Sequence, residues 1–218
     1  MMVAIDGIGM TSRRTRMRLI QRLREAGISD ERVLGAMEQV PRHIFLDEAL
    51  SHRAYEDTSL PIGHSQTLSQ PYIVARMTEV MMSASPKRVL ELGTGSGYQT
   101  TILANLCEEV FSVERIKPLQ DKARERMHLL RLRNVMLRLA DGPMGWPDRA
   151  PFDGIMVTAA PRTLPEELLG QLSDGGVMVA PVGEEQQMLV KVTRQGSRFH
   201  TENIEPVRFV PLLAGVVR

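Results

Sequence analysis

The residues best suited to chemistry form a glycine-rich run, E-L-G-T-G-S-G-Y, at positions 91–98. An apolar stretch at 89–92 predicts a strand before it, and the pattern through Ile102 predicts a helix after it. Glycines at such a turn let a ligand approach the backbone, and the helix start presents free N–H groups. Glu114 follows about 20 residues after Gly93, at the end of the next predicted strand, where a carboxylate can accept the hydroxyls of a ribose. Together these residues predict a site for an adenosine-bearing cofactor.

The spacing of the glycines narrows the choice of cofactor. Dinucleotide sites read G-x-G-x-x-G, whereas this run reads G-x-G-x-G, has Tyr98 where the packing glycine would fall, and is not followed by a phosphate-binding lysine. The run resembles that of the class I S-adenosylmethionine methyltransferases, in which an acid after the third strand contacts the adenine amino group. The resemblance implies S-adenosyl-L-methionine as cofactor, held by Glu91, Gly93, Thr94, Gly95, Ser96, Gly97, Glu114, Asp141 and Gly142. Two alternatives stay open: a glycine turn that only packs helix on sheet, and an Asp141 that only begins a turn.

Alternating strands and helices must position these residues. After residue 87, apolar strands are predicted at 89–92, 110–113, 135–139, 152–157, 177–182, 188–193 and 207–210. A helix opening near Pro165 is expected to contain Leu168, Leu169 and Leu172. Strands that are apolar throughout indicate an α/β fold with a doubly wound, mostly parallel sheet, and the missing helix before the last strand predicts an antiparallel edge.

The first third of the chain predicts helices. Thr11 and Ser12 are candidate caps for a helix whose apolar face holds Met17, Ile20 and Leu23. A second helix, with Ser29 and Asp30 as candidate caps, ends at Pro41. Residues 55–71 predict a long irregular loop. We expect an N-terminal helical extension at 1–60, a substrate and catalytic loop with its helix at 61–86, and a cofactor-binding α/β part at 87–218. The three parts are expected to form one structural domain.

The overall composition excludes several classes of protein. The 218 residues include 27 Lys and Arg against 26 Asp and Glu, a net charge of +1 that argues against coating nucleic acid or anionic lipid. One cysteine suits a reducing compartment, and no apolar run approaches the ~18 residues of a membrane span. The arginines between 13 and 24 are interpreted as the solvated face of the first helix. We therefore expect a cytoplasmic protein, a monomer or weak homo-oligomer, without nucleic-acid or membrane partners.

The marks of several other methyl acceptors are missing from the sequence. After the fourth predicted strand the chain reads T-A-A-P at 158–161, not the Asn/Asp-Pro-Pro-aromatic run typical of nitrogen methylation. Cys107 lies late in a predicted helix and is interpreted as a small core residue rather than a nucleophile. The five histidines lack metal-ligand spacing, so no metal is expected.

The segment at 61–72, P-I-G-H-S-Q-T-L-S-Q-P-Y, is rich in hydroxyl and amide groups. It resembles the signature of the protein-L-isoaspartate O-methyltransferases, as do shorter pieces at 40–45, 152–161, 181–184 and 208–212. Three residues depart from that family's usual pattern: Ser65, Leu68 and Ala140 stand where Gly, Ile and Gly are common. The resemblance implies that Ser69 is the catalytic serine. It further implies that Gln66, Thr67 and Leu68 border the cofactor and that Ser69, Val210 and Pro211 contact the substrate.

The implied reaction transfers a methyl group to the free α-carboxylate of L-isoaspartyl residues in damaged proteins and peptides, which starts repair to L-aspartyl. That carboxyl group is ionised near neutrality, so no general base is required, and Ser69 is expected to aim it by a hydrogen bond. Alternatives are a methyltransferase of another carboxylate or of RNA, and a non-catalytic sensor of adenosine ligands. Locally, Ser69 as a helix N-cap and Phe209 as a buried edge-strand residue also stay open.

Overall fold

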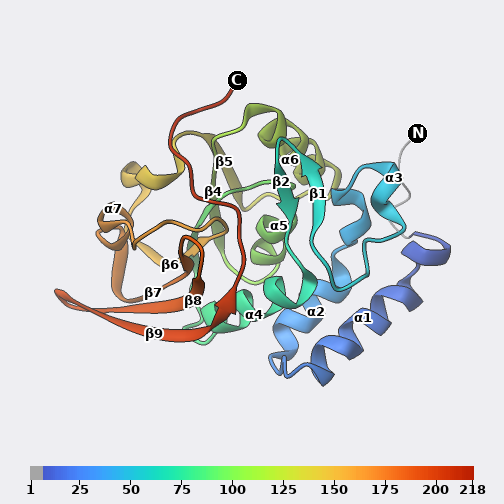
Figure 1. Ribbon diagram of the computed structural model, residues 1–218, viewed down its shortest axis with the longest axis horizontal. Coiled ribbons are helices and arrows are strands. Elements are labelled where there is room, and N and C mark those ends of the chain that lie inside the picture. Colours follow the sequence, from blue (N-terminus) through green and yellow to red (C-terminus); the bar gives the residue numbers. More distant parts are fainter. Residues whose placement is uncertain (1–6) are drawn as a thin grey trace.

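The computed structural model describes residues 7–218, and its N-terminal part is a layer of helices (Figure 1). These are α1 (Arg13–Glu25), α2 (Glu31–Gln39) and α3 (Glu48–Ser51), with 3-10 turns at Gly9–Thr11 and Arg42–Phe45. The predicted caps are confirmed, because Ser12 and Asp30 accept hydrogen bonds from the first-turn amides of Thr15 and Arg32. Within the described residues no helix is long and apolar enough to cross a bilayer.

The buried face of α1 differs from the prediction at one position. Leu19, Ile20 and Leu23 are buried, but Met17 is 52% exposed, and Arg16 lies on the apolar face instead. A helix turns 100° per residue, so position 16 lies closer than position 17 to the stripe formed by 19, 20 and 23. The Arg16 guanidinium donates to the carbonyl of Gln39 (3.2 Å). The other arginines of this helix are exposed, as expected.

The predicted loop at 55–71 contains regular structure. Strands β1 (Leu60–Gly63) and β2 (Gln66–Leu68) pair as an antiparallel hairpin whose turn holds His64 and Ser65 at positive φ. The apolar residues Leu60, Ile62 and Leu68 are buried by this pairing. Helix α4 (Pro71–Met82) follows, with Pro71 in its first turn.

A seven-stranded sheet forms the centre of the fold, in the order β5-β4-β3-β6-β7-β8-β9. The strands from β5 to β7 are parallel, whereas β8 and β9 add an antiparallel edge, as predicted. The strands are β3 (Arg88–Leu92), β4 (Glu109–Glu114), β5 (Val135–Leu139), β6 (Phe152–Val157), β7 (Leu172–Gly183), β8 (Gln187–Gln195) and β9 (Arg198–Val207). The connecting helices are α5 (Tyr98–Ala104), α6 (Lys117–Leu129) and α7 (Glu166–Leu169), with 3-10 turns at Gly142–Met144 and Pro147–Arg149.

Two boundaries in the C-terminal half were predicted wrongly. Leu172 does not end a helix but begins β7, because α7 stops at Leu169 and Gly170 follows it. The last strand is β9 at Arg198–Val207, not 207–210. Most side chains of β9 are exposed, so the strand lacks the apolar run that would identify it.

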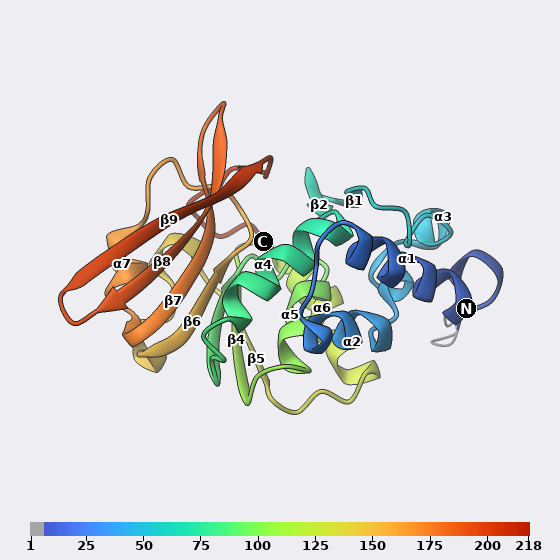
Figure 2. The ribbon, with the colours of Figure 1, turned by 90° about the horizontal axis from the view of Figure 1, so that it is seen from below.

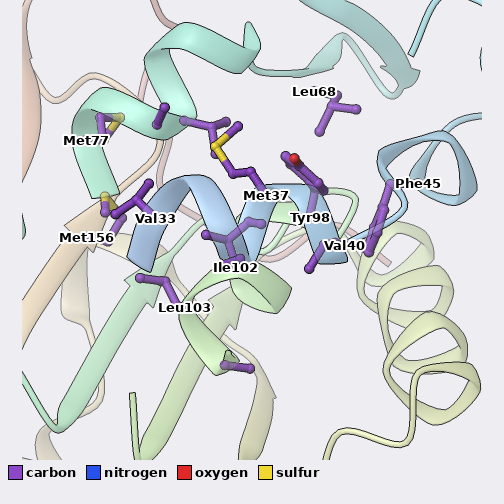
Figure 3. Close-up of a cluster of buried hydrophobic side chains, with 14 of the residues drawn as sticks. Val33, Met37, Val40, Phe45, Leu68, Met77, Tyr98, Ile102, Leu103 and Met156 are labelled. Atoms are coloured by element: carbon purple, nitrogen blue, oxygen red, sulfur yellow. The ribbon is translucent and has the colours of Figure 1, made fainter. Parts of the chain in front are cut away.

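Each face of the sheet has its own hydrophobic core. On one face, β-strand residues such as Val89 and Val110 pack with α4, α5 and α6, and the N-terminal helices cover these in turn. Figure 3 shows Val33, Met37 and Phe45 of that outer layer against Tyr98 and Ile102 of α5. On the other face, Leu90, Phe111 and Ile155 pack with α7. Figure 2 shows α4 between the N-terminal helices and the twisted edge of the sheet. The division of the chain into three segments stays a prediction.

Candidate active site

A cleft opens at the carboxyl ends of β3, β4 and β6, where the chain reverses its direction across the sheet. Counting the open space at its mouth, the cleft has a volume of about 920 Å³. Most residues predicted to bind cofactor or substrate line it: Gln66, Thr67, Leu68, Ser69, Gly93, Thr94, Gly95, Ser96, Glu114, Gly142, Val210 and Pro211. Glu91, Gly97 and Asp141 are not among its lining residues.

Backbone N–H groups hold the carboxylate of Glu114 at the cleft. Its Oε2 accepts from the amide of Gly95 (2.8 Å), and its Oε1 accepts from the amides of Arg115 and Ile116 (both 2.9 Å). These bonds fix the glycine loop against the end of β4. An ionised carboxylate has roughly four acceptor sites, so a further donor from a ligand can still be accepted. That this donor is a ribose hydroxyl stays a prediction.

Gly93 must be glycine because β6 approaches it closely. Its φ is +94°, and a Cβ at this position would lie 2.3 Å from Oγ1 of Thr158. The Thr158 hydroxyl lies within hydrogen-bond distance of the carbonyls of Leu92 (2.9 Å) and Gly93 (2.8 Å) and donates to them. Thr158 therefore fastens the loop to the end of β6 and lines the cleft, a role that its place in the T-A-A-P run did not suggest.

Glu91 supports the loop from below and does not reach the cleft. It is fully buried, and its Oε2 accepts hydrogen bonds from the hydroxyls of Thr100 and Ser112, both at 2.5 Å. The Ser112 hydroxyl also lies 2.6 Å from that of Thr94 in the loop. Burial raises the pKa of Glu91 to about 8, although the two hydroxyl hydrogen bonds act against this shift. The carboxyl group thus anchors a chain of hydroxyls under the glycine loop.

Gly97 and Asp141 lie behind and beside the cleft, respectively. Gly97 has φ +87°, and a Cβ there would lie 2.6 Å from Cε of Met127, so this glycine lets α5 pack closely on α6. Asp141 precedes the lining residue Gly142, and its Oδ1 is buried without a hydrogen bond from any described residue. A buried carboxylate oxygen without a donor suits a ligand that brings one.

The acceptor side of the cleft is formed by the hairpin and by the linker that carries Ser69. Ser69 lies between the end of β2 and the start of α4, half-buried, and its hydroxyl makes no hydrogen bond within the described residues. The interpretation of Ser69 as an N-cap is wrong, since Gln70 holds that position. The carboxylate of Asp57 caps the helix from a distance, accepting from the amide of Tyr72 (2.9 Å) and the amide side chain of Gln70 (3.0 Å). No sequence signal marked Asp57, because the contact joins residues far apart in the chain.

A second cavity, here called the acceptor groove, adjoins the cleft. The residues that line both are Thr67, Ser69, Thr158, Phe209 and Val210. Ser59, Gln70, Ile73, Pro206, Val207 and Arg208 complete the groove. Ser69 therefore lies on the wall between the cofactor cleft and the acceptor groove.

Residues 209–217, here called the C-terminal strap, cross the carboxyl end of the sheet. The strap pairs with Ala160 after β6, whose amide donates to Val210 (2.8 Å) and whose carbonyl accepts from Leu212 (2.8 Å). Farther on, the amide of Val217 donates to the carbonyl of Arg115 (2.8 Å). The strap thereby walls the cleft with Val210 and Pro211, and Phe209 takes part in the wall rather than in an edge strand.

The chemistry of the cleft agrees with the predicted cofactor. Among the described residues, no lysine lines the cleft to hold a pyrophosphate, and its charged lining residues are Glu114 and Arg115. The Arg115 guanidinium donates away from the cleft, to the carbonyl of Gly215 in the strap (2.8 Å). Within residues 7–218, no group of His, Cys, Asp and Glu is arranged to hold a metal ion. A sheet of this order with such a cleft at its switch point places the chain among the Rossmann-like methyltransferases.

Comparison with known proteins narrows this class to one family. The family model for protein-L-isoaspartate(D-aspartate) O-methyltransferase (PCMT) matches residues 14–216. The chain is 69% identical to protein-L-isoaspartate O-methyltransferase 1 of Marinobacter nauticus over 100% of both chains. It is 61% identical to the protein-L-isoaspartate O-methyltransferase of Cellvibrio japonicus over 98% of both. The chain therefore belongs to the protein-L-isoaspartate(D-aspartate) O-methyltransferase family.

Solved structures agree with this membership. One protein-L-isoaspartate O-methyltransferase superposes with a TM-score of 0.82 at 28% identity, covering 90% of this chain and 65% of that longer one. The beta-aspartate methyltransferase (PCMT) of Plasmodium falciparum, in complex with S-adenosyl-L-homocysteine, superposes with a TM-score of 0.81 at 26% identity. That match covers 91% of this chain and 98% of the other.

Proposed function

We propose that this enzyme transfers a methyl group from S-adenosyl-L-methionine to the free α-carboxylate of L-isoaspartyl residues in proteins and peptides. The observation that carries the proposal is the place of Ser69. Its unengaged hydroxyl lies on the wall shared by the cofactor cleft and the acceptor groove. A group at this wall can contact an acceptor that enters from the groove while the methyl donor occupies the cleft.

On the donor side, the cofactor supplies a methyl group on a positively charged sulfur. We infer that the amide-held carboxylate of Glu114 accepts a hydrogen bond from the ribose and that Asp141, whose Oδ1 has no donor among the described residues, accepts one from the adenine amino group. The glycine loop brings backbone rather than side chains to the rest of the ligand. These residues bind and orient, and none of them has to exchange a proton.

On the acceptor side, the protein has to orient a carboxylate that is already ionised, and it does not have to remove a proton from the acceptor. An α-carboxyl group has a pKa of about 3.5 and is ionised at neutral pH. Neither histidine nor lysine lines the cleft or the groove, which agrees with a reaction that needs no general base. The Ser69 hydroxyl can donate to one carboxylate oxygen and direct the other toward the cleft.

Positioning is then the main source of rate. The carboxylate oxygen would take the methyl group from the cationic sulfur, which would leave as a neutral thioether. Orientation of two bound reactants alone corresponds to effective molarities of about 10⁵ M or more. The strap residues Val210 and Pro211 and the hairpin residue Leu68 line the cleft in which the two reactants would meet. The ester product can cyclise to a succinimide and reopen as normal aspartate, so the same step begins repair of the damaged chain.

The proposal is tested with S-adenosylmethionine labelled in its methyl group and two peptides that differ only in an isoaspartyl or an aspartyl residue. We expect base-labile label, as from a methyl ester, in the isoaspartyl peptide alone. Equal labelling of both peptides, or of neither, would overturn the substrate assignment. A structured RNA in a third reaction tests the other acceptor class, and label in that RNA would count against the proposal.

A further inference from the structure

Arg42 is a charged side chain without any exposed surface. It follows α2 in the chain. It lies in the 3-10 turn Arg42–Phe45 and is 0% exposed. No carboxylate among the described residues forms an ion pair with it; it contacts two backbone carbonyls and an aromatic ring. Burying a guanidinium without a counter-ion is costly. Such a residue is expected to serve a purpose that apolar packing could not.

The partners of Arg42 belong to the two sides of the site. Nη2 donates to the carbonyl of Ser69 (2.8 Å) and Nε to the carbonyl of Ala54 (2.8 Å). The guanidinium carbon lies 5.0 Å from the centroid of the Tyr98 ring. Tyr98 begins α5 directly after the glycine loop and lines the cofactor cleft. One rigid group thus contacts both the linker that carries Ser69 and the helix that starts at the cofactor loop.

We propose that Arg42 is a positioning residue for methyl transfer, whose guanidinium sets where the Ser69 hydroxyl lies relative to the cofactor cleft. It holds the main chain of Ser69, while Asp57 holds Gln70 and Tyr72 on the far side. The linker is therefore fixed at both ends, and the hydroxyl between them stays free for the acceptor. The proposal rests on the function proposed for Ser69.

The charge of Arg42 is retained in this environment. Burial lowers the pKa of its guanidinium to about 10, and the neighbouring Asp57 acts against that shift. The group is thus protonated at neutral pH and donates in a planar fork, which lysine cannot reproduce. We expect Arg42→Lys to keep the charge but to lose one of the two carbonyl contacts and the stacking on Tyr98.

The chain offers a matched control in Arg16. It is also a buried arginine of the helical layer, 7% exposed, and its Nη1 donates to the carbonyl of Gln39. This hydrogen bond does not involve Ser69 or its linker, and the charge of Arg16, which also acts on Tyr98, is kept when lysine replaces it. Arg16→Lys therefore removes a buried guanidinium without changing a contact of the linker. It separates a general loss of folding stability from a displacement of the Ser69 hydroxyl.

The first measurement compares the two variants with the wild type at saturating cofactor. For Arg42→Lys we expect kcat on an isoaspartyl peptide to fall about 10- to 100-fold, since displacement of a reacting group by ~1 Å has effects of this size. Affinity for S-adenosylhomocysteine is expected to change less than about threefold, and Arg16→Lys is expected to keep kcat within about twofold. An unchanged kcat in Arg42→Lys overturns the proposal, as does an equal fall in Arg16→Lys.

The decisive measurement combines Arg42→Lys with Ser69→Ala. If Arg42 acts by aiming Ser69, its substitution changes kcat by less than about twofold once the hydroxyl is absent. Multiplicative effects of the two changes overturn the proposal. If Arg42→Lys does not fold, Asp57→Asn takes its place in the double variant with Ser69→Ala. Asp57 is exposed, and its substitution loosens the same linker. Multiplicative effects of these two changes on kcat again overturn the proposal. A wild type that labels no isoaspartyl peptide refutes the proposed function instead.

Discussion

The two sides of the site are built in different ways. Around the cofactor cleft, the glycine loop is held by residues of the adjacent strands β3 and β4. Glu91 and Ser112 lie beneath the loop, and Glu114 accepts a hydrogen bond from the amide of Gly95. Around the acceptor, the Ser69 linker is held by Arg42 and Asp57, which come from distant segments. The loop residues Thr94 and Ser96 are 3% and 4% exposed, whereas Thr67 and the hairpin turn lie at the surface.

This difference separates binding from turnover. A buried, locally bonded loop is a preformed ligand site, and changes in it are expected to alter cofactor affinity. A surface hairpin with a serine between two long-range contacts can receive a bulky peptide, and changes in it are expected to alter kcat with little effect on the cofactor. Each prediction below tests whether the two sides keep to these separate roles.

The largest effect is expected from Glu114→Ala. The change leaves the amides of Gly95, Arg115 and Ile116 without their acceptor and removes the proposed ribose contact. Hydrogen bonds to a charged group contribute roughly 1.5–3 kcal/mol each, so the Kd for S-adenosylhomocysteine should rise about 100-fold or more. Calorimetric titration measures this. Glu109→Ala, at the opposite end of the same strand, is the control and should keep its affinity. A Kd for Glu114→Ala within about threefold of wild type contradicts the assignment.

Ser69→Ala tests the other side of the comparison. Loss of one hydrogen bond to a charged oxygen corresponds to roughly 1.5–3 kcal/mol, so kcat should fall about 10- to 100-fold at saturating donor. Affinity for S-adenosylhomocysteine should stay within about twofold, because the hydroxyl faces the acceptor. Ser83→Ala, at the opposite end of α4, is the control. If the variant loses cofactor affinity and keeps kcat, Ser69 belongs to the donor side and the separation of roles is wrong.

Glu91→Gln tests whether the donor loop rests on a protonated acid. In the native state the pKa of Glu91 is about 8, against an ordinary value of 4.5, so folding favours the protonated form. Stability from this group is therefore complete below about pH 4.5 and is lost as the pH rises toward 8, at up to about 1.4 kcal/mol per pH unit. Denaturant unfolding of wild type and variant from pH 5 to 8 measures the difference between them. The wild-type free energy of unfolding should fall relative to that of the variant across this range. Parallel curves mean that Glu91 is ionised in the folded protein.

The donor side could be predicted from the sequence because its residues are close together in the chain or end neighbouring strands. The loop at 93–97 and Glu114 were found from spacing, and strand order then placed them together. Spacing alone did not distinguish residues that face a ligand from those that pack behind it. Glu91 and Gly97 share the motif with Gly95, yet one lies below the loop and the other against α6.

The acceptor side followed from family resemblance rather than from physical pattern. Ser69, Val210 and Pro211 line the cleft, and that they contact the substrate stays a prediction. The contact that holds Ser69 was not predictable from the sequence. Arg42 donates to the backbone carbonyl of Ser69, and every residue type has such a carbonyl. The hairpin at 60–68 was missed for a similar reason. Its strands are too short for periodicity, and its turn uses His64 and Ser65 at positive φ instead of the usual glycine or asparagine.

The smallest effect is expected at the open end of the acceptor groove. Arg208 is exposed, and among residues 7–218 it is the one charged side chain that lines the groove. Isoaspartyl peptides with acidic neighbours should therefore react with a kcat/KM about two- to fivefold above that of peptides with lysine neighbours, since exposed ion pairs contribute roughly 0.2–1 kcal/mol. Arg208→Ala should abolish this preference, and about 0.5 M NaCl should reduce it in the wild type.

Arg198→Ala is the control for Arg208, because Arg198 is also an exposed arginine and begins β9, whereas Arg208 directly follows the other end of that strand. Its loss changes the net charge by the same amount without touching the groove. If both variants reduce the preference equally, the selectivity comes from overall charge. If only Arg208→Ala does, the groove reads the residues that flank the damaged site. The acceptor side then selects among peptides through the single surface charge of Arg208. The buried donor side holds the same cofactor in every turnover, and neither substitution should change its affinity for that cofactor.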